Sequence, residues 1–140
     1  MLEQWLSISQ KMFKLNQSWE KTWKVSSKLC FQFSNLSADY NPMHTDKNFA
    51  KSYGFKDKIV HGNILQLFLS YFVGEMLPKK NVVIISQKIK YLKPIYVNQH
   101  ITLKSKLENL NWTMGLLEFR IVFNTRCERI AEGKLDVKIL

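Results

Sequence analysis

An aspartate and a histidine flank a proline turn in the segment FSNLSADYNPMHTD, residues 33–46. Proline fixes its own φ and disfavours helix at the preceding residue, so the chain bends at Asn41-Pro42 and the side chains of Asp39 and His44 can face the same way. Such a pair can hold a water and transfer its protons, if burial beside apolar walls draws the carboxylate pKa toward neutrality. Taken alone, the spacing favours a structural turn, in which Asp39 caps the backbone and His44 is a loop histidine.

A second histidine, His61, precedes Gly62 at the start of a long apolar segment. If a helix begins here, the Gly62 amide is one of its unpaired N-terminal donors, and the absence of a Cβ lets a ligand carbonyl approach closely. The helix dipole adds partial positive charge, which suits an enolate or oxyanion. The alternative is a glycine required only for close packing of the helix. We interpret His61 itself as a structural histidine bonded to backbone.

The elements around these residues are predicted from periodicity and capping signals. Residues 61–77, HGNILQLFLSYFVGEML, have almost no polar face, which predicts a helix buried on nearly all sides. Upstream we expect a strand at 18–25, a helix capped by Ser26 or Ser27 that runs to about Leu36, and a loop at 37–44. A second short helix, capped by Thr45 or Asp46, should end at Gly54 as a left-handed residue.

Four strand-like segments follow, at 81–93, 95–107, 115–124 and 129–139. Apolar and polar residues alternate in LLEFRIVF and KLDVKIL, which indicates half-buried antiparallel strands. A sheet curled around the apolar helix is the economical packing, so we predict an α+β fold. The 140 residues are most simply one domain, 1–140, in which 1–15 form an N-terminal arm or helix.

Composition narrows the location and the partners. The apolar segment 64–77 is too short and too interrupted to span a bilayer, and the N-terminus does not resemble a signal peptide, so we expect no membrane association. Two cysteines make no disulfide framework, which favours the cytoplasm. The net charge of +10 favours an anionic partner. The lysines at 88/90 and 104/106 should line the outer face of strands as a solvated surface, and clustered arginines and aromatics are lacking, so nucleic acid is not expected.

The segment FSNLSADYNPMHTDKNFAKSYGFKDKIVHGNIL strongly resembles the MaoC-like, (R)-specific enoyl-CoA hydratase family of hot-dog-fold proteins. The shared pattern is S-x-D-x-N-P-[ILM]-H-x-D, then F-A, then Gly-Phe, then I-V-H-G. The resemblance covers residues from about 20 to 140. It implies a hot-dog fold, in which an antiparallel sheet wraps around a long central helix.

The resemblance also implies roles for individual residues. Asp39 and His44 would be the catalytic pair that activates water, and the Gly62 amide would hold the thioester carbonyl. Further residues would line the site: Ser70, Asn41, His61 and Asn63. For Ser70 the alternative is a helix serine bonded to its own backbone.

Three departures from the family pattern stand out. Asn63 replaces a methionine or other apolar residue, which bears on the acyl pocket and so on the substrate. Ala38 replaces a frequent glycine before the aspartate, and YVNQHI replaces the common P-V-x-x-G-D turn. None of the departures removes a catalytic group.

The implied activity is a hydratase or dehydratase that interconverts trans-2-enoyl and (3R)-3-hydroxyacyl thioesters. The substrate would be carried by CoA or by the phosphopantetheine of an acyl carrier protein, with no other cofactor. No metal is expected, because His44, His61, His100 and the two cysteines lack zinc-like spacing. A homodimer, or a multiple of dimers, with the site near the subunit boundary is also implied. The alternatives are a hot-dog thioesterase, which the intact Asp39/His44 pair argues against, and a non-catalytic acyl-thioester-binding protein.

Overall fold

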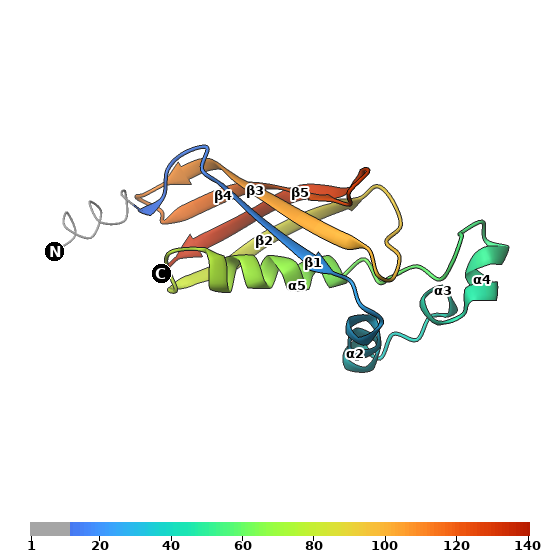
Figure 1. The fold of residues 1–140 in the computed structure, drawn as a ribbon. Coiled ribbons are helices and arrows are strands. Elements are labelled where there is room, and N and C mark those ends of the chain that lie inside the picture. Colours follow the sequence, from blue (N-terminus) through green and yellow to red (C-terminus); the bar gives the residue numbers. More distant parts are fainter. Residues whose placement is uncertain (1–11) are drawn as a thin grey trace.

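A five-stranded antiparallel sheet curls around one helix in the computed structural model, which describes residues 12–140 (Figure 1). The strands are β1 (Ser18–Lys24), β2 (Val82–Tyr91), β3 (His100–Asn111), β4 (Leu116–Asn124) and β5 (Arg129–Ile139). Their spatial order is β1-β3-β4-β5-β2, so β1 and β2 are the edge strands. The predicted arm at 1–15 falls mostly outside the described residues.

Four of the five strand predictions are confirmed at or near their predicted bounds, whereas the strand expected at 95–107 is displaced. It begins at His100 and runs to Asn111, and residues 92–99 form a connection instead. Pro94 has no N–H to donate to a strand ladder. Asn98 has a φ of 69°, which turns the chain before β3 begins. These two residues explain why β3 begins at His100 and not at residue 95.

The central helix consists of α5 (Ile64–Tyr71) followed by a π-helical turn, η1 (Phe72–Met76). Leu65 and Leu69 on its inner side have no exposed surface, and they face the inner residues of the sheet. The rings of Trp23 and Phe68 stack at 4.5 Å, which fixes β1 against the helix. Phe13 is 2% exposed and packs beside Trp19. The residues just before β1 therefore belong to the core.

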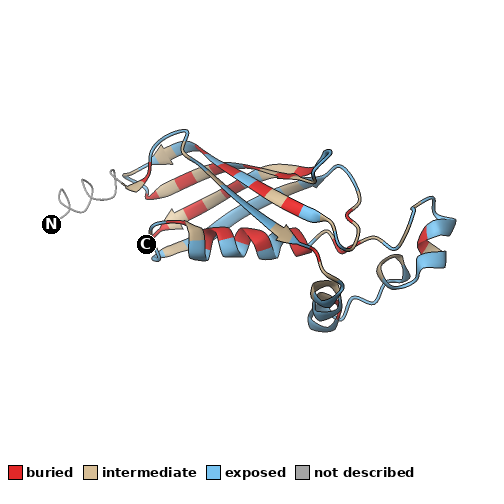
Figure 2. Ribbon diagram, in the orientation of Figure 1, coloured by how far each residue is buried: buried red, intermediate tan, exposed pale blue. Residues whose placement is uncertain are grey.

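Two expectations about the central helix are wrong. It begins at Ile64, because residues 61–63 form a turn before it. It is also not buried on nearly all sides, because Gln66, Leu67, Ser70 and Tyr71 are exposed along one side, as the alternating colours of α5 in Figure 2 show. An apolar pattern predicts burial, but within one chain the sheet covers only one side of this helix.

Three helices connect β1 to α5 along the chain: α2 (Ser27–Ser37), α3 (Pro42–Thr45) and α4 (Lys47–Ser52). Figure 1 shows them away from the sheet. Ser26 caps α2, and Asp46 caps α4 through two backbone amides. The loop predicted at 37–44 is partly helical, because the Asn41 side chain caps α3 and Pro42 occupies its first turn. Gly54, with a φ of 87°, follows α4 as expected.

The outer face of the sheet carries a row of positive charges. Lys106 pairs with Arg120, Arg120 with Lys134, and Lys134 with Lys88, so one basic residue stands directly opposite the next across four adjacent strands. All four are exposed, as expected for an outer sheet face. No ion pair involves any of them in the described part of the chain.

No helix among residues 12–140 is long and apolar enough to cross a membrane.

Candidate active site

Asp39 lies just after α2, where Ala38 adopts a left-handed conformation with a φ of 56°. One carboxylate oxygen accepts a hydrogen bond from the Asn41 amide at 3.1 Å. The other oxygen lies 3.6 Å from Nε2 of His61. The side chain is 47% exposed, so a single chain does not supply the apolar burial that the sequence interpretation required. Asp39 therefore caps the turn and also faces the cavity.

His44 projects from α3 with one ring nitrogen already used. Its Nδ1 lies 2.8 Å from the backbone oxygen of Ile59. Because a carbonyl oxygen can only accept, Nδ1 carries the proton and Nε2 keeps a free lone pair. In the neutral tautomer that this bond selects, Nε2 can accept a hydrogen bond from a bound water.

His61 is buried and touches both members of the pair. Its ring stacks on His44 with centroids 3.8 Å apart and packs on the other side near Phe33, at 5.0 Å. Nε2 donates to the backbone oxygen of Asp39 at 3.0 Å. Nδ1 is buried with no hydrogen-bond partner among the described residues. His61 is therefore bonded to the backbone, as expected, and it also lines the site.

The three side chains gather polar atoms around one small volume. One ligand atom from each of Asp39, His44 and His61 lies within 4.8 Å of the others. A water that makes hydrogen bonds of about 2.8 Å can bridge two such atoms. The arrangement can therefore hold a water between these groups.

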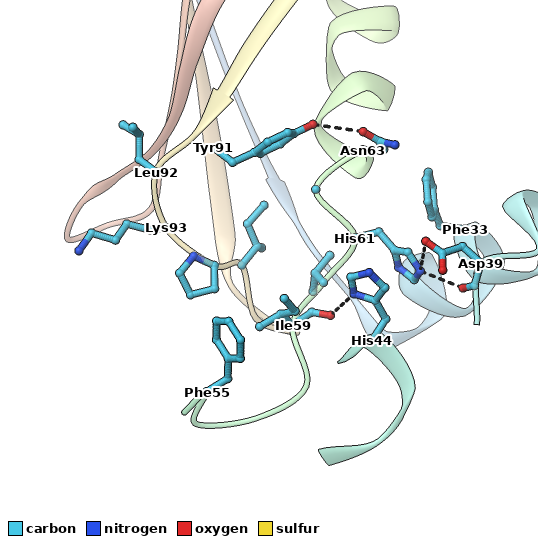
Figure 3. A pocket seen from close by; sticks show the side chains of 14 residues that line it. Phe33, Asp39, His44, Phe55, Ile59, His61, Asn63, Tyr91, Leu92 and Lys93 are labelled. Atoms are coloured by element: carbon cyan, nitrogen blue, oxygen red, sulfur yellow. Dashed lines mark hydrogen bonds and ion pairs between the residues drawn. The ribbon is translucent and has the colours of Figure 1, made fainter. Parts of the chain in front are cut away.

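A cavity of about 490 Å³ opens beside these residues (Figure 3). Asp39, His44 and Gly62 contribute polar groups to its wall. Apolar and aromatic side chains make most of the rest, namely Phe33, Phe55, Ile59, Val60, Leu92, Pro94 and Ile95. A second cavity of about 680 Å³ shares His44 and His61 with the first. The site can therefore hold a ligand that extends away from the reacting atoms in two directions.

Gly62 presents an unpaired backbone amide at the turn before α5. Its N–H donates no hydrogen bond in the described part of the chain. A Cβ at this position would lie 2.9 Å from Cε1 of Tyr91. The close approach of Tyr91 supports the packing explanation for the glycine, and the open amide is available for the predicted contact with a ligand carbonyl.

Tyr91 is a site residue that the sequence did not reveal. Its hydroxyl donates to Oδ1 of Asn63 at 3.2 Å, and its ring covers Gly62. Burial raises the pKa of Tyr91, partly offset by its hydrogen bond with Gln66. The only available signal was its place in an alternating strand, two residues after Ile89, and no motif distinguishes it from neighbouring apolar positions.

Of the other three residues predicted to line the site, one borders a cavity and two do not. Asn63 lines the first cavity, whereas Asn41 and Ser70 line neither of the two. The Asn41 side chain accepts from the Met43 amide at 2.9 Å and so serves α3. Ser70 is exposed on the open side of α5. Contact of either residue with a substrate stays a prediction.

Known proteins with similar sequences carry related activities in their names. The MaoC-like domain pattern matches residues 10–116. An (R)-specific enoyl-CoA hydratase of Aeromonas caviae is 36% identical over 70 residues, about half of each chain (50% and 52%). A mitochondrial 3-hydroxyacyl-[acyl-carrier-protein] dehydratase of Arabidopsis thaliana is 24% identical over 119 residues, or 85% of this chain and 69% of its own.

The fold is shared with solved structures as well. An (R)-hydratase from A. caviae, described as involved in PHA biosynthesis, superposes with a TM-score of 0.84 over 91% of this chain and 98% of its own, at 24% identity. At that identity the likeness shows the fold alone, and it confirms the predicted hot-dog architecture. With the domain pattern matching most of its length, the chain belongs to the MaoC-like domain family.

Proposed function

We propose that this protein is a hydratase/dehydratase that interconverts trans-2-enoyl and (3R)-3-hydroxyacyl thioesters. The observation that carries the proposal is the convergence of Asp39, His44 and the unpaired Gly62 amide on one cavity. The names of the relatives support the same reaction. The metal-free and cofactor-free chemistry needs only these groups and a water.

The reaction follows from the geometry of these groups. The thioester carbonyl oxygen accepts a hydrogen bond from the Gly62 N–H, which stabilises the negative charge that develops when water adds to C3. Asp39 takes a proton from that water, while Nε2 of His44 accepts a hydrogen bond that orients it. The pair then helps to return one proton to C2. In the reverse direction the same groups remove water from the hydroxyacyl thioester.

The carrier is CoA or an acyl carrier protein. CoA carries phosphates, and carrier proteins are usually acidic, so the net charge of +10 favours encounter with either. The thiols of Cys30 and Cys127 are free. Free thiols suit a reducing compartment, and we propose the cytoplasm.

We also propose a homodimer joined along β2. This edge strand exposes Val83, Ile84 and Ile85, with exposed fractions of 40%, 37% and 56%. Unpaired strand edges with apolar side chains pair readily with another strand. Leu67 and Tyr71 are further exposed apolar side chains, on α5. A second copy would also cover the half-exposed Asp39 side of the molecule. Light scattering tests this proposal, and a stable mass of 16.6 kDa contradicts it.

Hydration of crotonyl-CoA, followed by the loss of its enone absorbance, tests the activity. Asp39→Asn keeps the shape and removes the base, so kcat should fall by roughly 100- to 10,000-fold. Asp136→Asn, the same change on the outer sheet face, is the control and should keep wild-type activity. Wild-type protein that hydrates neither CoA nor carrier-protein thioesters, at short or long chain length, would refute the proposed reaction.

A further inference from the structure

The Asn63 side chain is oriented by two hydrogen bonds to the same atom. Its Oδ1 accepts from the Tyr91 hydroxyl at 3.2 Å and from Nε2 of Gln66 at 3.3 Å. An amide oxygen has two lone pairs, so the accepting capacity of this side chain is fully used. The oxygen is therefore fixed toward Tyr91, and the NH₂ group must face the other way.

The NH₂ group of Asn63 has no hydrogen-bond partner among the described residues. Asparagine at the start of a helix normally uses its oxygen to cap the first amides. Asn63 occupies the N-cap position of α5 but makes no cap bond. Its backbone is already helical, with φ −64° and ψ −11°, and its oxygen is engaged by Tyr91 and Gln66. In Figure 3 its nitrogen points away from Tyr91, toward the side where Phe33 and Asp39 lie.

Two unused donors thus come from consecutive residues at the start of α5. The Gly62 backbone N–H is unpaired, and the Asn63 side-chain N–H groups follow it on the same wall of the cavity. Pairs of fixed donors next to a helix N-terminus stabilise a developing oxyanion, because they need no reorganisation as charge appears.

We propose that the Asn63 side-chain amide is a second hydrogen-bond donor to the thioester carbonyl oxygen, beside the Gly62 N–H. Asn63 is then a catalytic residue, and Tyr91 and Gln66 are the positioning residues that hold its amide. The proposal rests on the proposed hydratase function and adds a group to it. The resemblance implies a methionine or other apolar residue at this position, where this chain has a side-chain donor.

Asn63→Asp separates the donor from the rest of the side chain. Aspartate keeps the shape and an oxygen for Tyr91 and Gln66 but replaces the NH₂ group by a charged oxygen. It is also well tolerated at a helix N-terminus, so the variant should fold. With crotonyl-CoA we expect kcat to fall by roughly 10- to 100-fold, with KM changed by less than about twofold. Asn63→Met should lower kcat in the same way.

Asn48→Asp makes the same chemical change on exposed α4, outside both cavities, and should keep the wild-type kcat. Tyr91→Phe removes one of the two positioning bonds and should lower kcat less than Asn63→Asp does. A wild-type kcat in Asn63→Asp would overturn the proposal while leaving the Asp39-dependent hydratase reaction intact.

The carbonyl stretching frequency of a bound thioester reports directly on hydrogen bonds to its oxygen. Crotonyl-CoA with a ¹³C-labelled carbonyl, bound to the inactive Asp39→Asn protein, should show a carbonyl stretch at lower frequency than in water. Adding Asn63→Met should move that band back toward higher frequency. A band that is identical with and without Asn63→Met would show that Asn63 does not touch the carbonyl, and would overturn the proposal even if kcat falls. If the wild type prefers another enoyl thioester, that thioester carries the ¹³C label, so that the band reports on Asn63 separately from the choice of carrier and chain length.

Discussion

The middle of the sheet and its β2 edge have the same apolar character but very different surroundings. Ile121, Phe123 and Val137 on the inner faces of β4 and β5 have no exposed surface, whereas Ile85 on β2 is 56% exposed. Strand pairing and α5 cover the first group, whereas no part of residues 12–140 covers the exposed side of Ile85. Tyr91, which lines the cavity, is the last residue of this same edge strand. The inner face of the sheet is buried within one chain, whereas the site adjoins the edge strand at which we propose that a second chain binds.

The largest effect is expected in the middle of the sheet. Phe119→Ala removes a side chain that is 1% exposed and packs edge-on against Phe72 at 5.3 Å. The lost contacts and the cavity should lower the free energy of unfolding by about 3–5 kcal/mol. Urea unfolding measures this loss, which should be independent of protein concentration. A loss below 1 kcal/mol would show that the centre is not the rigid part of the fold.

The junction between the two regions can be tested at Gly133. A Cβ at this position of β5 would lie 1.8 Å from the backbone oxygen of Lys88 on β2. Backbone atoms cannot move aside as a flexible side chain can, so Gly133→Ala should cost at least about 1–3 kcal/mol. Amide hydrogen exchange should show faster exchange in β2 than in β3 and β4. Equal acceleration in all strands would mean that β2 is not a separable edge.

The edge itself can be changed with little cost to the single chain. Ile85→Lys places a charge on an exposed position at the β-bulge of β2, so a folded monomer should keep its stability within about 0.5 kcal/mol. The dimer should dissociate, because burying an unpaired charge in an interface is unfavourable. Light scattering should report a halved mass, and the melting temperature should no longer rise with protein concentration. An unchanged mass would place the interface elsewhere.

The smallest effect concerns the ionisation of Tyr91. Its pKa is raised above the ordinary value of 10.0 by burial, so the folded protein holds this proton more tightly than the unfolded chain does. Its contribution to stability is therefore present below the ordinary value and is lost as the pH rises through the raised pKa. Phenolate absorbance of the wild type minus Tyr91→Phe reports this titration. In the monomeric Ile85→Lys variant the pKa should be lower than in the dimer, because less surface covers the ring.

Capping and alternation predicted much of this fold. The strand at 129–139 was predicted at its observed bounds, and Ser26 and Asp46 cap the helices for which they were candidates. These signals are local, because a capping side chain or a period-two pattern needs only neighbours in the chain. The exposed side of α5 could not be predicted, because it depends on how much of the helix one sheet can cover.

The candidate site was predicted unevenly for the same reason. The resemblance placed Asp39, His44 and Gly62, and the structure brings them to one cavity. It gave no indication of Tyr91, because a tyrosine in a strand has no local mark of what it covers. The orientation of Asn63 depends on Tyr91 and Gln66, so sequence alone gave its position but not the direction of its amide.

The basic row on the outer sheet face affects how the protein responds to its solvent. Lys88, Lys134, Arg120 and Lys106 oppose like charge with like charge across neighbouring strands, which weakens the sheet in dilute buffer. Dissolved salt shortens the range of this repulsion to about 8 Å at physiological ionic strength. A fold held by surface ion pairs loses stability when salt is added. This sheet should instead become more resistant to unfolding as the ionic strength rises, and in the meantime the same charges keep its broad faces from stacking on one another.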